Sequence, residues 1–83
     1  MKEVKELFIE EIDVVFNDWV KCYSNSEVIE ELNNSKFDTI KKINEAESLE
    51  KIQEICVDVF TENGCEEGQA FEFYAGVLEK VVV

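Results

Sequence analysis

The chain has 83 residues, of which 46% are hydrophobic, so we expect residues 1–83 to fold as one small domain rather than to stay disordered. Its formal net charge is −12, from 20 acidic residues and eight lysines, which disfavours direct binding to nucleic acid or to an anionic membrane and favours a basic protein partner. Histidine is absent, so the commonest general base and metal ligand are missing, and we expect no enzymatic activity, no cofactor and no metal site.

The first segment with a helical pattern runs from Glu3 to Cys22. Apolar residues recur there at steps of three and four, which is the period of an amphipathic α-helix. Further apolar side chains fall outside this stripe, so we expect the helix to lie centrally in the fold or to meet a partner with part of its surface. The stripe consists of Val4, Leu7, Phe8, Ile12, Val15, Phe16, Trp19 and Cys22.

Capping signals divide the middle of the chain. Ser24 followed by Glu27 has the spacing of a capping box and predicts the start of a second helix. Asn33-Asn34 predicts its end, because asparagine tolerates the left-handed conformation found at helix ends. Ser35 followed by Asp38 repeats the capping spacing and predicts a third short helix. The alternative is that both segments form one bent helix.

Two more helices are predicted in the rest of the chain. Either Ser48 or Asn44 caps the first of them, and Asn63-Gly64 has the composition expected where it ends. The last helix begins near Glu66. Gly76 lies inside it and costs about 1 kcal/mol relative to alanine, which predicts close contact with a neighbouring helix at that point.

The expected fold class is all-α: a compact bundle of four to five helices with antiparallel neighbours and no sheet. No segment of useful length alternates between apolar and polar residues, and no Asn-Gly turn joins two β-branched segments. Val81-Val82-Val83 is too short to form a strand alone. Short connections between helices favour antiparallel packing of consecutive helices.

The expected compartment is the cytoplasm. Three cysteines without CxxC spacing do not resemble the disulfide framework of a secreted domain. The first residues lack the basic segment and continuous apolar block of a signal peptide. No apolar run approaches the roughly 20 residues needed to span a bilayer.

Two of the predicted helices carry regular rows of carboxylates on the side opposite their apolar residues. Like charges at steps of three and four lie about 5–6 Å apart and destabilise a helix by roughly 0.2–0.5 kcal/mol per pair. Such rows therefore require either a compensating function or a benefit in solubility. The first row is Glu3, Glu6, Glu10 and Asp13, and the second is Glu47, Glu50, Glu54, Asp58 and Glu62.

These rows suggest a protein that acts by occlusion. Carboxylates spaced regularly on a rigid helix can imitate nucleic-acid phosphates and cover the basic surface of a nucleic-acid-handling protein, for example a defence nuclease targeted by a phage or mobile element. An immunity protein or antitoxin against a basic toxin has the same electrostatic signature. A homodimeric scaffold or adaptor, associating through Phe73 and Val82, is the alternative from another class.

Overall fold

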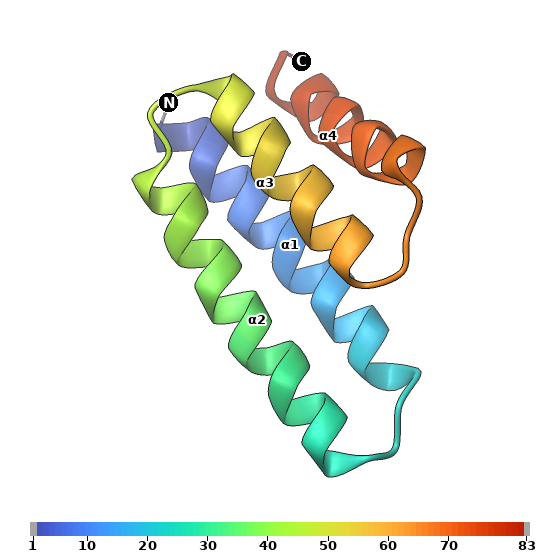
Figure 1. The fold of residues 1–83 in the computed structure, drawn as a ribbon. Coiled ribbons are helices and arrows are strands. Elements are labelled where there is room, and N and C mark those ends of the chain that lie inside the picture. The colour runs from blue at the N-terminus through green and yellow to red at the C-terminus, as the bar shows by residue number, and fades with distance from the viewer. Residues whose placement is uncertain (1, 83) are drawn as a thin grey trace.

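The computed structural model describes residues 2–82, which form four α-helices. These are α1 (Lys2–Lys21), α2 (Ser26–Glu45), α3 (Leu49–Glu62) and α4 (Glu67–Val82). Consecutive helices run in opposite directions, and the turn between α1 and α2 projects beyond the ends of α3 and α4 (Figure 1). No strand occurs within residues 2–82. The all-α bundle with antiparallel neighbours is therefore confirmed, with the smaller of the two expected numbers of helices.

The middle of the chain forms one continuous helix, which was the alternative to the two short helices that the capping signals favoured. α2 continues without a break from Ser26 to Glu45, so the predicted end at Asn33-Asn34 is wrong. Ser35 caps nothing; its backbone carbonyl accepts a hydrogen bond from the Thr39 hydroxyl at 2.8 Å, inside the helix. Leu32, Thr39 and Ile43 are buried on one face of α2. Burial of this continuous face outweighs the weak local preference of asparagine for a helix end.

The predicted cap of α3 is confirmed, whereas the predicted cap of α2 is wrong by one residue. Ser48 caps α3 as predicted, with its hydroxyl accepting from the backbone N–H of Lys51 at 3.2 Å. The cap of α2 is Asn25 and not Ser24, because the Asn25 side-chain oxygen accepts from the N–H of Glu27 at 2.9 Å. The shift follows from asparagine being at least as good a cap as serine.

Glycines behave differently at the two positions that the sequence singled out. Gly64 adopts a φ of 82° directly after α3, and the N–H of Cys65 donates to the carbonyl of Phe60 at 2.9 Å, so the predicted helix end is confirmed. At Gly76 an added Cβ would meet no atom within 4 Å. The predicted close helix contact at Gly76 is therefore wrong.

Aromatic rings from three helices form a continuous chain through the core. Trp19 of α1 contacts Phe60 of α3 with ring centroids 5.3 Å apart, and Phe60 contacts Phe73 of α4 at 5.2 Å. Phe73 also meets Phe8 of α1 at 6.3 Å, edge to face. Such pairs contribute about 0.5–1.5 kcal/mol each beyond the burial of their area. The helix α2 adds no ring to this chain, because its only phenylalanine, Phe37, is 65% exposed.

The helices are arranged around a square. In the described part of the chain, α1 and α3 each pack against α2 and α4, and they do not approach one another at the backbone. The two therefore lie across the diagonal of the bundle, and only large side chains such as Trp19 and Phe60 meet across its centre. As a consequence, the outward faces of α1 and α3 point to opposite sides of the molecule.

The cap assignment at α2 can be tested with two adjacent alanine substitutions. We expect Asn25→Ala to lower the free energy of unfolding by about 1 kcal/mol, because two backbone N–H groups lose their acceptor. Ser24→Ala is the matched control and should change it by less than about 0.5 kcal/mol. Urea denaturation followed by circular dichroism measures both. An equal loss in the two variants would contradict the assignment.

Candidate functional site

The first predicted row of carboxylates lies along the outer surface of α1. Glu3, Glu6 and Glu10 are exposed and form no ion pair with any described residue. Asp13 is half-buried and pairs with Lys36 of α2 at 3.0 Å, which ties the two helices together. Three of the four acids in this row therefore present free negative charge to solvent.

The second predicted row follows α3 and the turn before it. Glu47 lies in that turn, while Glu50, Glu54, Asp58 and Glu62 belong to the helix, and all five are exposed. Among the ion pairs of the described residues, only Glu54 of this row takes part, with Lys51 on the same helix at 3.4 Å. An exposed pair of this kind contributes little stability, so it leaves most of the charge of the row in place.

The two rows do not form one surface. Because α1 and α3 are diagonal in the bundle, a flat partner surface facing one row cannot reach the other. The predicted exposed positions on helices hold for these acids except Glu47, which lies in the turn before α3, and the half-buried Asp13. The sequence gave no means of relating the two helices in space. The acids must therefore be considered as two separate surfaces.

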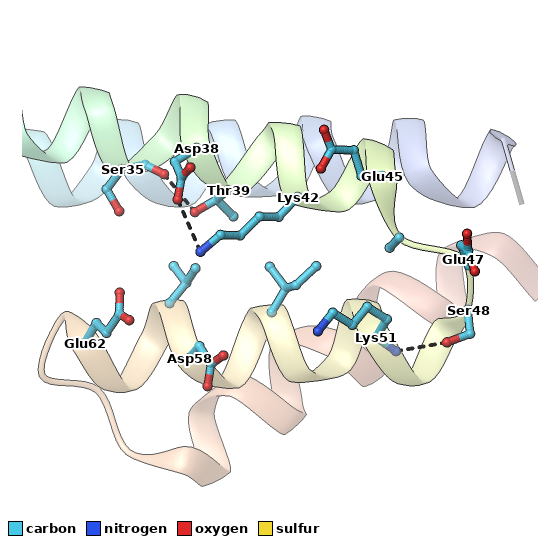
Figure 2. A pocket seen from close by; sticks show the side chains of 13 residues that line it. Ser35, Asp38, Thr39, Lys42, Glu45, Glu47, Ser48, Lys51, Asp58 and Glu62 are labelled. Atoms are coloured by element: carbon cyan, nitrogen blue, oxygen red, sulfur yellow. Dashed lines mark hydrogen bonds and ion pairs between the residues drawn. The ribbon is translucent and has the colours of Figure 1, made fainter.

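A groove between α2 and α3 gathers part of the second row with acids that the sequence analysis missed (Figure 2). Its volume is about 590 Å³. Three members of the predicted row line it, namely Glu47, Asp58 and Glu62, and α2 adds Asp38 and Glu45. Asp38 had been assigned to a helix cap. In one continuous helix, the seven-residue spacing of Asp38 and Glu45 places both on one face.

The floor of the groove is formed by small and aliphatic side chains. Ser35 and Thr39 of α2 and Ala46 of the following turn line the groove on one side, whereas Ile55 and Val59 line it from α3. Apart from Ser35, these residues are each at most 5% exposed, so they pack together as the floor of the groove, while the charged residues around them stay exposed. The groove therefore has a nearly buried floor and a charged rim.

Two lysines lie in the groove without neutralising it. Lys42 extends between the helices and pairs with Asp38 at 3.2 Å (Figure 2). Lys51 pairs with Glu54, which is not among the residues lining the groove. The remaining carboxylates form no ion pair within residues 2–82; they are Glu45, Glu47, Asp58 and Glu62. The groove therefore has a surplus of negative charge.

The residues predicted for contact between two copies of the chain are placed only in part. Phe73 is half-buried and packs against Phe8 and Phe60, so most of its ring serves the core of the protein itself. The side chain of Val82 lies outside the described residues. Homodimerisation through these two residues stays a prediction.

Two titratable groups in the interior have altered acidity. Burial raises the pKa of the Cys56 thiol to about 12, so that it stays protonated at neutral pH. The pKa of Tyr74 is also raised, first by burial and then by the nearby Cys56 and Glu50. The Tyr74 hydroxyl donates to the carbonyl of Leu49 at 3.3 Å, linking α4 to α3. Neither group lines the groove.

Within residues 2–82, no three or more cysteine or acidic side chains are close enough together to hold a metal ion. None of the helices in this part of the chain has the length and apolar character needed to cross a membrane. Comparisons with protein-family models, with curated proteins and with solved structures found no match for the chain. The groove and the acidic rows therefore have to be interpreted from their own chemistry.

The unpaired acids predict a stabilising effect of salt. Raising the ionic strength from about 0.01 M to about 0.1 M shortens the screening length from about 30 Å to about 10 Å. We expect the midpoint of thermal unfolding to rise, because repulsion among the surface carboxylates is screened. Differential scanning calorimetry measures the midpoint, and a Glu6→Gln/Glu10→Gln variant should gain less from salt. A midpoint that falls with salt would contradict this account.

The burial of Cys56 predicts its reactivity. In a Cys22→Ser/Cys65→Ser variant, Cys56 should not react with a disulfide reagent at pH 8 until urea unfolds the chain. Because its folded pKa lies above the ordinary 9.0, the stability that the neutral thiol contributes should be lost as pH rises from about 9 towards 12. Absorbance of the released thiolate measures the reaction. Rapid labelling of the folded variant would show that Cys56 is accessible.

Proposed function

We propose that the protein is a non-catalytic acidic binding protein that inhibits a basic, nucleic-acid-handling protein by occlusion. The observation that carries the proposal is the state of the nine carboxylates in the two rows. Eight of the nine are exposed, and only Asp13 and Glu54 are paired with lysines within residues 2–82. Acids that served only to hold helices together would be bridged to neighbouring cations.

The geometry of the bundle supports rapid recognition of a basic surface. Charges fixed on helices keep their spacing, whereas charges on a flexible tail would have to be ordered on binding at a cost in entropy. A concentrated negative field also accelerates encounter with a positively charged partner, and the rate falls as salt increases. A protein with this surface competes with nucleic acid for the same cationic side chains.

The nature of the target is left open between two kinds of basic protein. A defence nuclease and a basic toxin both present lysine and arginine clusters to nucleic acid or to an inhibitor. The homodimeric scaffold is less well supported, because Phe73 is engaged in the core and a net charge of −12 opposes self-association. We therefore keep inhibition by occlusion as the proposal.

Capture of partners at two salt concentrations tests this function. The immobilised protein should retain basic nucleic-acid-binding proteins from lysate at low salt and release them at high salt, because screening weakens the attraction. Each captured protein is then purified, and its binding to labelled nucleic acid is measured with and without the acidic protein. We expect the nucleic acid to be displaced.

A variant with six charge-reversing substitutions provides the control for the role of charge. Changing Glu3, Glu6, Glu10, Glu50, Glu54 and Asp58 to lysine reverses the charge at six of the nine acids in the two rows while leaving the buried residues untouched. This variant should neither capture the partner nor displace nucleic acid. Partners that resist high salt and keep their nucleic acid bound would contradict occlusion, and light scattering that shows a dimer at high salt would favour the scaffold.

A further inference from the structure

We infer that the α2–α3 groove is the place where the target docks, and that its occupant is a lysine- or arginine-rich segment of the target protein. This inference rests on the proposed function and narrows it from two acidic surfaces to one. The groove differs from the α1 row because it is hollow, so that cationic side chains can enter it rather than only lie against it. The shape of the groove and the distribution of charge in it both fit a lysine- or arginine-rich segment.

The dimensions suit side chains and not a whole helix. On α2 the lining residues run from Ser35 to Glu45, which corresponds to roughly 15 Å along a helix axis at 1.5 Å per residue. The volume of about 590 Å³ lies in the range of sites that hold small ligands. Several long side chains from one face of a basic segment fill such a space while their backbone stays outside.

The distribution of charge matches long cationic side chains. Unpaired carboxylates stand at both ends of the groove, with Glu45 and Glu47 near the α2–α3 turn and Glu62 near the opposite end of α3 (Figure 2). Ile55 and Val59 lie between them on α3. Both are only 5% exposed, so they form a nearly buried floor over which the apolar stem of a lysine or arginine can pass while its charged tip meets a carboxylate.

The side chain of Lys42 already occupies part of the groove in the manner that we infer for the target. Its stem extends between the two helices and its ammonium group meets Asp38 (Figure 2). At 59% exposure this side chain is free to swing into solvent, and an exposed pair of this type contributes little stability. Displacing it therefore costs the protein little when a second cation arrives.

A steric test separates docking in the groove from attraction by overall charge. Lys42→Trp fills the groove and at the same time makes the protein more acidic, whereas Lys41→Trp makes the same charge change at an exposed residue that does not line the groove. The probe is a fluorescein-labelled oligolysine peptide, and its dissociation constant is measured by fluorescence anisotropy at low salt. We expect Lys42→Trp to weaken binding by about tenfold and Lys41→Trp to leave it within about twofold.

Neutralising variants test the acids themselves. Glu45→Gln/Asp58→Asn/Glu62→Gln removes three charges from the groove, and Glu3→Gln/Glu6→Gln/Glu10→Gln removes three from the α1 row. The groove variant should weaken oligolysine binding by about tenfold or more, and the α1 variant by less than about threefold. Circular dichroism establishes that each variant remains folded, and the isosteric changes at exposed positions favour this result.

The possible outcomes separate the inference from the function on which it rests. Weaker binding in both groove variants, with both controls preserved, supports docking in the groove. Equal loss in the two neutralised variants, together with equal binding by the two tryptophan variants, overturns the groove and leaves occlusion by overall charge intact. Failure of the unmodified protein to bind oligolysine at low salt overturns both.

Discussion

The chain of aromatic rings that joins α1, α3 and α4 is the interaction on which the rest of the structure depends. Trp19, Phe60 and Phe73 bring the three helices together without any ring from α2. The remaining helix, α2, is held mainly through its contact with α1, including the ion pair between Lys36 and Asp13. Since the core does not need α2 to pack tightly on α3, the seam between them is free to carry polar residues and to stay open.

The sequence predicted most of the fold because helical periodicity and caps are local signals. The apolar stripe in residues 3–22 identified α1, and Ser48 and Gly64 correctly bounded α3. The break at Asn33-Asn34 was wrong because a local preference was weighed without the burial of the residues around it. Phe37 is a second case in which residue type alone misleads, because phenylalanine is usually buried and yet this ring is exposed.

The candidate site was predicted only in part, for a reason of geometry. Each acidic row follows from spacing along one helix, which a sequence displays directly. The groove requires knowing that α2 and α3 are adjacent and that Ser35 and Thr39 face Ile55 and Val59, and no spacing within one helix contains this information. The separation of the two rows onto opposite sides of the bundle was hidden for the same reason.

Solubility alone does not account for the groove. A proteome that favours glutamate explains exposed acids anywhere on the surface, and the three successive pairs within each helical row cost only about 0.6–1.5 kcal/mol per row. The open rim of the groove is a different kind of cost, because leucine or valine at half-buried Ser35 would bury apolar area worth up to about 1.5–3 kcal/mol. Acids contribute to solubility equally well beside a closed seam. What distinguishes this surface is therefore the combination of free carboxylates with space between two helices, and that combination is what a cationic side chain of a partner can use.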